Sequence, residues 1–334
     1  MNIRQIIFLI ITSICLFGLG LSVLASQVSG NRVNIAYISD LNLYHTPSQT
    51  QGVKHVLEKK IGVQVYESQA IFQEIIKYIN QKLTPDVVIF GGNNITDAEK
   101  TENLWQLFLD MISELKSDVF VNLGVNELKI YNIDELIHSL SIFGYKTKSS
   151  WHSQKIKNYL FIGLDSVSLF NNPRLSKEQL KWFASTLSQN KDMVTVVTLY
   201  HSLLDSEGNV LNNSLAKKII EIISVNPQIK LVMFGGEYFN RVHLLKSCIF
   251  VNSPSPVVYP CSFKFIELLP DRIQIKTVHI PLKGIINKAL KSAQEAEYFK
   301  SKTSSNDVKS YLLGKKQDLR FDYVFLKPSD LKNR

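Results

Sequence analysis

Short apolar runs alternate with amphipathic segments through most of the chain, and this alternation limits the possible fold more than any other feature. Apolar segments such as 87–90 and 194–199 end in glycine or polar residues, as buried strands do. Between such segments, apolar side chains recur at helical spacing, as Ile71, Ile75 and Ile79 do. Strands that alternate with helices over short loops are typical of parallel βαβ units. The sequence therefore predicts an α/β fold.

The expected elements form one continuous region from residue 33 to 326, with a linker at 26–32 and a C-terminal tail at 327–334. After residue 247 the pattern becomes strand-rich, which predicts late strands that pair antiparallel at a sheet edge. A polar linker is expected at 301–307. Strands are predicted at 33–40, 87–90, 119–123, 159–164, 194–199, 230–234, 248–252, 263–268 and 273–278, and helices at 68–83, 104–115, 177–188, 215–224 and 285–300.

The N-terminal segment differs from the rest of the chain in composition. Residues 6–25 form an uncharged run of 20 residues, long enough to cross a bilayer as a helix. The run fits an uncleaved membrane anchor, and the small residues around Ala25 and Ser26 also fit the cleavage site of a signal peptide. Both interpretations place residues 30–334 on the extracytoplasmic side, periplasmic or secreted, with the membrane contacted through residues 6–25.

The net charge bears on the class of binding partner, and the cysteines bear on a possible disulfide. The net charge is +9, but no motif that interleaves basic and aromatic residues accompanies it, so we expect no nucleic-acid partner. Two cysteines, Cys248 and Cys261, follow the apolar run. In an oxidising compartment they could close a short loop as a disulfide, and the alternative is a pair of separate buried thiols.

Five predicted strands end in small or polar residues. In open α/β sheets, ligands bind outside the carboxyl ends of the strands, so these loops are where chemistry is expected. In chain order the loops read Ser39-Asp40-Leu41-Asn42, Gly91-Gly92-Asn93-Asn94, Gly124-Val125-Asn126-Glu127, Tyr200-His201-Ser202 and Gly235-Gly236-Glu237-Tyr238.

The order and composition of these loops resemble the calcineurin-like metallophosphoesterases, whose strand ends carry D-x-H, G-D, G-N-H-D/E, a lone H and G-H-x-H. The framing sequence agrees. Residues 85–92 are similar to the family's PD-hydrophobic-TGD segment, and residues 175–182 are similar to the helix before its histidine strand. Residues 253–263 resemble a late loop of bacterial members. The resemblance implies an αββα sandwich of two mixed sheets flanked by helices, preceded by the N-terminal transmembrane or signal helix.

The resemblance also implies a chemistry. The family holds two divalent metal ions bridged by an aspartate, activates a water between them and attacks a phosphoester. Carboxylate and imidazole suit this task because each donates a lone pair to the cation, and the carboxylates offset its charge. If this chain is active, it therefore requires two ions of Mn, Fe or Zn.

Most positions that correspond to the family's ligands carry other residues in this chain. Asp40 and His201 keep the expected types as possible metal-ligand remnants, and Glu127 is retained beside a lost centre. Asn93 removes the bridging charge. Asn126 stands where the family has the acid for the leaving group, a role that an amide cannot fill. Histidines are replaced by Asn42, Gly236 and Tyr238, and the ligand asparagine is replaced by Val125.

These departures favour a non-catalytic binding or scaffolding protein with no metal cofactor and an unknown ligand or protein partner. Without dications, clustered carboxylates would repel one another, and Asp-to-Asn exchange relieves that strain. Candidate residues for a ligand pocket are Asn93, Asn94, Tyr44 and Glu237. The alternative is an active metal-dependent phosphoester hydrolase with a reduced or rearranged site.

Overall fold

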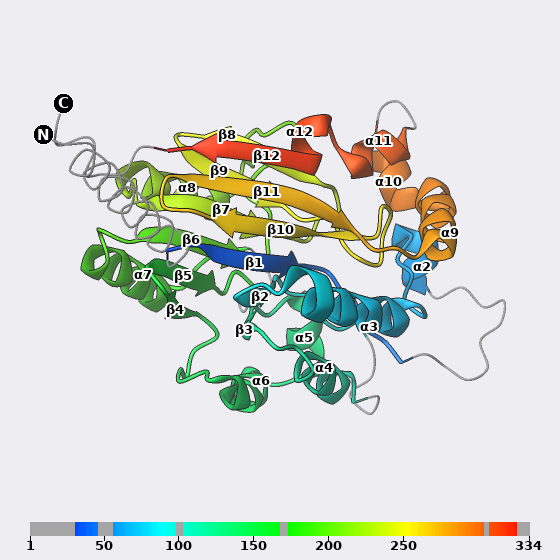
Figure 1. Cartoon of the computed structure of the whole chain (residues 1–334), viewed down its shortest axis with the longest axis horizontal. Coiled ribbons are helices and arrows are strands. Elements are labelled where there is room, and N and C mark those ends of the chain that lie inside the picture. The colour runs from blue at the N-terminus through cyan, green and yellow to red at the C-terminus, as the bar shows by residue number, and fades with distance from the viewer. Residues whose placement is uncertain (1–30, 46–55, 98–102, 168–172, 304–306, 326–334) are drawn as a thin grey trace, which may run out of the picture.

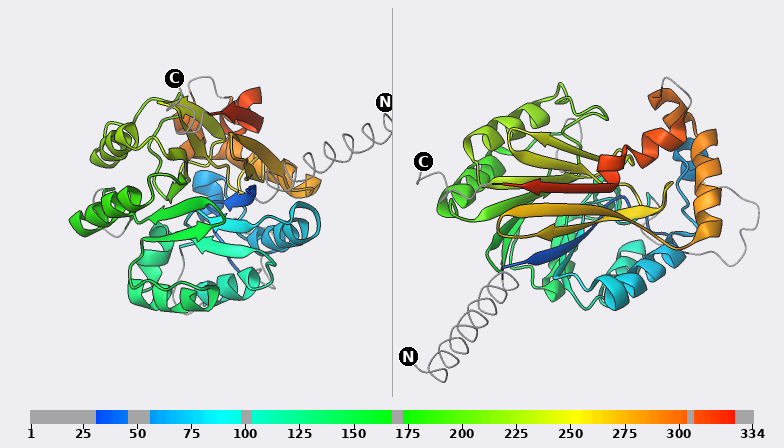
Figure 2. Two further views of the ribbon diagram at one scale, coloured as in Figure 1. Left: turned by 60° about the vertical axis from the view of Figure 1, so that its left-hand side comes forward. Right: turned by 45° about the horizontal axis from the view of Figure 1, so that its top comes forward.

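The protein folds as a sandwich of two sheets with helices on both outer faces (Figures 1 and 2). The computed structural model describes residues 31–45, 56–97, 103–167, 173–303 and 307–325. Each sheet has six strands and mixes parallel with antiparallel pairs. This arrangement confirms the predicted architecture of two mixed sheets flanked by helices.

The first sheet has the strand order β12-β11-β10-β1-β2-β3. Strands β1, β2 and β3 run parallel, and β10, β11 and β12 extend the sheet by antiparallel pairing, as predicted for the late strands. The strands span Val33–Ile38 (β1), Val87–Phe90 (β2), Asp118–Val121 (β3), Ser262–Leu268 (β10), Arg272–His279 (β11) and Arg320–Val324 (β12).

The second sheet has the strand order β4-β5-β6-β7-β9-β8. The prediction of antiparallel pairing at a sheet edge holds on one side of 248–252, where β9 pairs with the edge strand β8. On the other side β9 runs parallel to β7, because the chain reverses through β8. Among the described strands of this sheet, only the edge strands β4 and β8 are antiparallel to their neighbours. The strands span His152–Ile156 (β4), Tyr159–Leu164 (β5), Val194–Leu199 (β6), Ile229–Phe234 (β7), Arg241–Leu245 (β8) and Cys248–Asn252 (β9).

The helices divide between the two outer faces of the sandwich. Helices α3 and α4 pack on the first sheet, and α7 and α8 pack on the second (Figure 1). The helices span Val56–Ile61 (α2), Ser68–Tyr78 (α3, continued by a π-helical turn at Ile79–Leu83), Leu104–Ile112 (α4), Val125–Ile130 (α5), Ile133–Ser139 (α6, continued by a 3-10 turn at Leu140–Phe143), Lys177–Gln189 (α7), Ser214–Val225 (α8), Lys283–Glu295 (α9), Glu297–Lys302 (α10), Val308–Leu313 (α11) and Lys316–Leu319 (α12).

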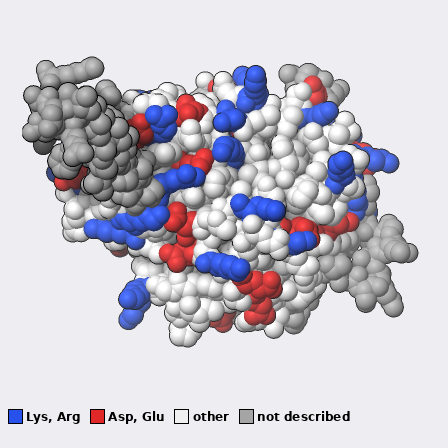
Figure 3. All heavy atoms as spheres, viewed as in Figure 1, with Lys and Arg blue, Asp and Glu red and all other residues white. Residues whose placement is uncertain are grey.

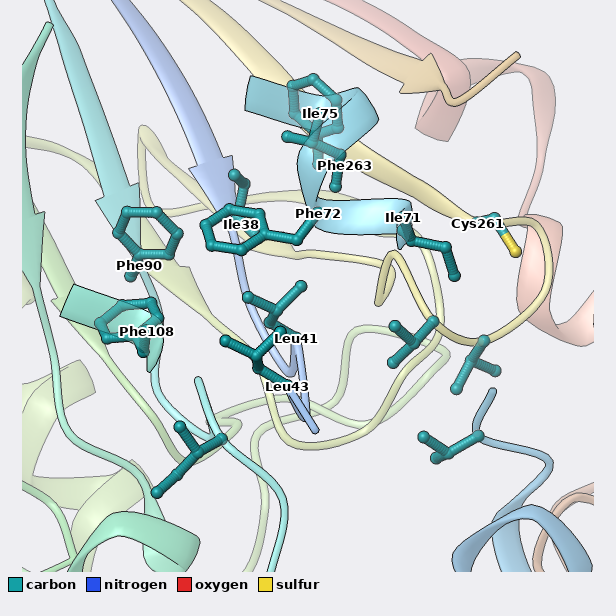
Figure 4. Packing of buried hydrophobic residues seen from close by; sticks show 14 of the residues in the cluster. Ile38, Leu41, Leu43, Ile71, Phe72, Ile75, Phe90, Phe108, Cys261 and Phe263 are labelled. Carbon is teal, nitrogen blue, oxygen red and sulfur yellow. The ribbon is translucent and has the colours of Figure 1, made fainter. Parts of the chain in front are cut away.

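The apolar strand runs are explained by burial on both sides of each sheet. One core layer lies between the sheets, and one lies under the helices of each outer face. Under α3 and α4, the rings of Phe72, Phe90 and Phe108 pack against one another at centroid distances of 5.1 to 6.3 Å (Figure 4). The tail of β1 continues into this layer through Leu41 and Leu43 (Figure 4). The loop that carries Asp40 is therefore held by core packing on either side.

Two predictions for the C-terminal part need correction. The helix expected at 285–300 is two helices, because Ala296 adopts an extended backbone and its side chain is buried. The linker expected at 301–307 begins later, since Ser301 and Lys302 belong to α10. Strands β4, β8 and β12 were not predicted, because short edge strands carry polar residues at alternate positions and lack a continuous apolar run.

The two cysteines lie in separate parts of the core. Cys248 and Cys261 are both buried and free, so the disulfide alternative is wrong. They belong to core layers on opposite outer faces of the sandwich. The alternative of two separate buried thiols therefore holds.

The predicted anchor at 6–25 and the tail at 327–334 lie outside the described ranges. In the described ranges, no helix has the length and apolar character that crossing a bilayer requires. Basic and acidic residues are interspersed over the face shown in Figure 3.

Candidate functional site

The loops that follow β1, β2, β3, β6 and β7 meet where the carboxyl ends of the two sheets come together. The backbone N–H of Gly236, after β7, donates to Asp40 Oδ2, after β1, at 2.8 Å. A Cβ at Gly235 would lie 1.8 Å from Ser39 Oγ, so only glycine allows the two sheets to approach this closely. We call the residues gathered here the strand-end cluster: Asp40, Asn42, Asn93, Asn94, Asn126, Glu127, Tyr200, His201 and Tyr238.

Asp40 is the buried carboxylate of the cluster. It adopts a left-handed backbone with φ of 55°, which turns the chain sharply at the end of β1. Its Oδ2 accepts from Gly236 N and from Ser39 Oγ at 2.9 Å, while Oδ1 has no hydrogen-bond partner among the described residues. Burial raises the pKa of Asp40 to about 6, against the opposing effect of these hydrogen bonds.

Three asparagines form a continuous amide network beside Asp40. Asn93 accepts the backbone N–H of Asn126 at 3.0 Å and donates its amide N–H to the hydroxyl of Tyr200. Asn126 donates to Asn42 Oδ1 at 3.1 Å and to the carbonyl of Ile95 at 3.0 Å. Asn42 in turn donates to the backbone carbonyl of Asp40 at 3.0 Å. The amide oxygens of Asn42 and Asn93 therefore already accept hydrogen bonds from within the protein.

Glu127 locks two loops together. Its side chain is fully buried and accepts the backbone N–H groups of Asn94, Ile95 and Gly124, the last at 2.6 Å. Burial raises the pKa of Glu127 to about 7. Asn94 beside it is also fully buried and donates to the carbonyl of Asn122 at 3.0 Å. Both residues thus hold the ends of β2 and β3 in register.

His201 pairs with a residue that the sequence did not single out. Its Nδ1 lies 3.0 Å from Ser166 Oγ, in the loop after β5. Burial lowers the pKa of His201, and a hydrogen bond to the backbone of Ser166 opposes this shift. The ring also stands edge-on to Tyr200 at 5.1 Å. Tyr200 was noted in the loop after β6 but was not chosen as a candidate, although its position directly after the strand is the signal that could have identified it.

The loop after β7 is fixed from outside by α10. Tyr238 is buried and stands edge-on to the rings of Tyr298 and Phe299, at 6.1 and 6.2 Å. Glu237 accepts from the Tyr298 hydroxyl at 3.1 Å and pairs with Lys302 at 3.3 Å. The four residues predicted to line a ligand pocket therefore lie in different surroundings, as the next contacts show.

Asn93 and Asn94 are buried in the network, and Glu237 is partly exposed at its border. Tyr44 packs on the core with its ring 6.0 Å from that of Tyr66. Val125 opens α5 and Gly236 adopts a positive φ of 81°.

Comparison with known proteins identifies the family. A family model described as calcineurin-like phosphoesterase matches residues 33–240. The chain therefore belongs to the calcineurin-like phosphoesterase family, which confirms the resemblance seen in the sequence. A search of curated protein sequences gave no match.

Solved structures agree on the fold. The chain resembles a dimetal phosphatase from Danio rerio with a TM-score of 0.60, at 13% identity over 74% of this chain and 96% of that one. It also resembles GAP50, the anchor in the inner membrane complex of Plasmodium, with a TM-score of 0.52, at 14% identity over 77% and 87% of the two chains. A putative 5'-nucleotidase from Staphylococcus aureus has a TM-score of 0.51 at 12% identity over 75% of this chain, which spans 54% of that chain's length.

The donor groups of the cluster do not fit the two-metal centre of the family. In the described part of the chain, no group of three or more His, Cys, Asp or Glu residues is arranged to hold a metal ion. Asp40 offers one oxygen without a partner, and His201 has Nδ1 engaged by Ser166. The side chain of Asn93, which the resemblance assigns to the bridging position, is hydrogen-bonded at both its oxygen and its nitrogen.

Proposed function

We propose that this protein is a non-catalytic binding or scaffolding member of the calcineurin-like phosphoesterase family, held on the extracytoplasmic side of a membrane by residues 6–25. The observation that carries the proposal is the engagement of Asn93. Its carboxamide ties Asn126 to Tyr200 at the position where the family bridges two cations with a carboxylate. A neutral amide supplies no charge to hold two dications together.

The proton donor of the family's reaction is also replaced. Asn126 donates both to Asn42 and to the carbonyl of Ile95, and an amide has no proton to give a leaving group near neutral pH. The network therefore supports a structural use of these loops. In such a protein the strand-end cluster stiffens the ends of both sheets and presents their loops to a partner.

Contacts of Asn31 and Arg32 bear on how an anchored domain would be oriented. The backbone carbonyl of Asn31 accepts from the Tyr159 hydroxyl at 2.8 Å, and Lys157 donates to the carbonyl of Arg32 at 2.6 Å. These contacts lie at the starts of β1 and β5, at the opposite end of the strands from the strand-end cluster. An anchor at residues 6–25 that joins the domain at this end would leave the strand-end cluster facing away from the bilayer. GAP50, which shares the fold, is an anchor, so the fold is compatible with such a role.

Metal content and turnover test the catalytic part. The full-length protein is expressed with Mn²⁺, Fe²⁺ or Zn²⁺ supplied and assayed for bound metal and for hydrolysis of phosphomonoesters and phosphodiesters. We expect less than stoichiometric metal and no turnover above that of the His201→Ala variant. The exposed His138→Ala variant is the matched control. Stoichiometric metal together with turnover lost only in His201→Ala would establish an active hydrolase with a reduced site and overturn the proposal.

Fractionation tests the location. We expect the full-length protein to remain in the membrane fraction after an alkaline wash, and its folded domain to be digested by protease added outside the cytoplasm. Deletion of residues 6–25 should release the protein from the membrane. Protection of the domain from external protease would contradict the proposed orientation.

A further inference from the structure

Strand β4 offers an open edge on the second sheet. It is joined to β5 by two residues, Lys157 and Asn158, so the flanking pair Ile156 and Tyr159 is the hydrogen-bonded pair that closes the hairpin. Because hydrogen-bonded and non-hydrogen-bonded pairs alternate in antiparallel strands, the backbone groups of Ser153 and Lys155 point away from β5. Within the described ranges, no backbone hydrogen bond from another segment covers them.

A pocket of about 490 Å³ lies along this edge. Ser153 and Gln154 of β4 line one side, and the loop at 143–149 lines the other. Two of the chain's three tryptophans, Trp151 and Trp182, also line it, and both are partly exposed. Pockets lined by aromatic side chains with a few polar groups are typical binding sites. A strand placed beside β4 would direct alternate side chains toward this pocket.

The surroundings of the pocket are basic. Lys146 lines the pocket, and Lys148 follows in the same loop. Lys155 belongs to β4, and all three residues are exposed. None of these lysines forms an ion pair with an acidic residue in the described part of the chain. Three free ammonium groups along an open strand edge complement an acidic ligand.

We propose that the β4 edge and its pocket bind an extended acidic peptide segment of a partner protein by strand addition. The peptide backbone pairs with Ser153 and Lys155, an apolar side chain enters between Trp151 and Trp182, and acidic side chains face the lysines. Main-chain hydrogen bonds provide affinity and the pocket provides specificity in this mode of recognition. None of the residues that line the pocket belongs to the strand-end cluster, and the proposal does not depend on whether that cluster binds metal.

The backbone pairing is tested with a fluorescent eight-residue peptide that alternates glutamate with leucine, measured by anisotropy against the full-length protein. Two versions carry N-methyl groups on alternate amides, one in each register. We expect the register that faces β4 to bind about tenfold more weakly and the other to bind like the parent peptide. Equal binding of the two registers, or no binding of the parent peptide, would overturn the proposal.

The side-chain contacts are tested with variants. Trp182→Ala and the double variant Lys146→Glu with Lys155→Glu should each weaken binding about tenfold or more, whereas Lys217→Glu on α8 should not. The double variant should in turn bind a peptide that alternates lysine with leucine. Unchanged far-UV circular dichroism shows that each variant is folded. Capture of the protein by phosphatidylglycerol vesicles through the same lysines, without peptide binding, would assign this surface to lipid and refute the peptide proposal.

Discussion

The molecule contains two buried polar clusters that handle charge in opposite ways. The strand-end cluster holds two buried carboxyl groups, Asp40 and Glu127, among neutral amides. The second cluster centres on Lys264 of β10, whose side chain is fully buried. Its Nζ donates to the backbone carbonyl of Asp318 at 2.7 Å and to Thr277 Oγ1 at 3.1 Å. We call the second group, formed by Lys264, Thr277 and Asp318, the lysine cluster.

The difference between the clusters shows how this fold tolerates buried charge. The buried carboxylate of Asp318 favours the charged form of Lys264, but burial has the larger effect and lowers the pKa of Lys264 overall. Asp40 and Glu127 have hydrogen bonds but no basic side chain among the groups that stabilise them. In a metal-loaded relative, dications would supply that positive charge. An amide at position 93 adds no further negative charge beside these two buried carboxyl groups.

The two clusters also impose opposite pH dependence on stability. Burial raises the pKa of Asp40 to about 6 and that of Glu127 to about 7, so their contribution is complete in acid and is lost as pH rises through those values. Burial lowers the pKa of Lys264 from 10.5 to about 7, so its contribution is complete in alkali and is lost as pH falls toward 7. Four substitutions test this contrast.

The largest effect is expected from Glu127→Ala. Removal of the carboxyl leaves three buried backbone N–H groups without an acceptor and opens a cavity between the ends of β2 and β3. We expect the free energy of unfolding to fall by roughly 3–5 kcal/mol, measured by chemical denaturation of the full-length protein. The exposed Glu114→Ala variant should change it by less than about 0.5 kcal/mol. Equal effects of the two substitutions would show that Glu127 does not hold the loops together.

Asn93→Asp is the next largest perturbation. It places a second carboxylate beside Asp40 and removes the donor to Tyr200, so two like charges share a desolvated site. We expect a loss of about 3 kcal/mol in unfolding free energy at pH 8 and a smaller loss at pH 5, where protonation relieves the repulsion.

The Asn93→Asp variant also tests whether the strand-end cluster can bind divalent cations. Unfolding of Asn93→Asp is measured with and without millimolar Mn²⁺, alongside the wild-type chain. No recovery of stability is expected. A stabilisation by Mn²⁺ that is seen only in the variant would mean that this single substitution restores a metal site, and a stabilisation of both chains would contradict the scaffolding proposal.

Lys264→Met tests the second cluster with a side chain of similar length and no charge. The wild-type protein should gain stability as pH rises from about 7 toward 10, and the variant should lack most of this gain, a difference of roughly 2–3 kcal/mol across the window. The measurement is denaturation at four pH values. Lys217→Met, at an exposed position, should keep the wild-type slope, and an unchanged slope in Lys264→Met would contradict the assignment.

The sequence predicted the bounds of the strands better than it predicted which strands pair and in which direction. The apolar runs of β5 and β6 gave the correct bounds, because each run is buried on both faces and ends at a polar loop. The parallel pairing of β9 with β7 was not predicted, because an apolar run of five residues is the same whether its neighbour runs parallel or antiparallel.

For the candidate site too, the sequence predicted positions better than contacts. The strand-end loops led to the prediction of Asp40, Asn93 and Asn126, and hydrogen bonds join these residues at the carboxyl ends of the strands. The pairings of Asn93 with Tyr200 and of His201 with Ser166 arise between segments 107 and 35 residues apart. The first contact depends on how the two sheets meet and the second on the pairing of β5 with β6, and no local sequence pattern records either.

Asp40→Asn should have the smallest effect and the opposite sign. The new amide oxygen can still accept from Ser39 and from Gly236, and the amide nitrogen takes the place of Oδ1, which has no partner in the described structure. Removal of the buried charge is expected to raise the unfolding free energy by about 1–2 kcal/mol at pH 8 and to leave it nearly unchanged near pH 4, where the carboxyl of the folded chain is protonated. Asp97→Asn, at an exposed position, serves as control. The opposite result would be an Asp40→Asn variant that is less stable than the wild-type protein at pH 8, by a margin that is larger with Mn²⁺ than without. That result would identify Asp40 as a metal ligand. The contrast between the two clusters would then reflect a missing cation and not a neutralised site.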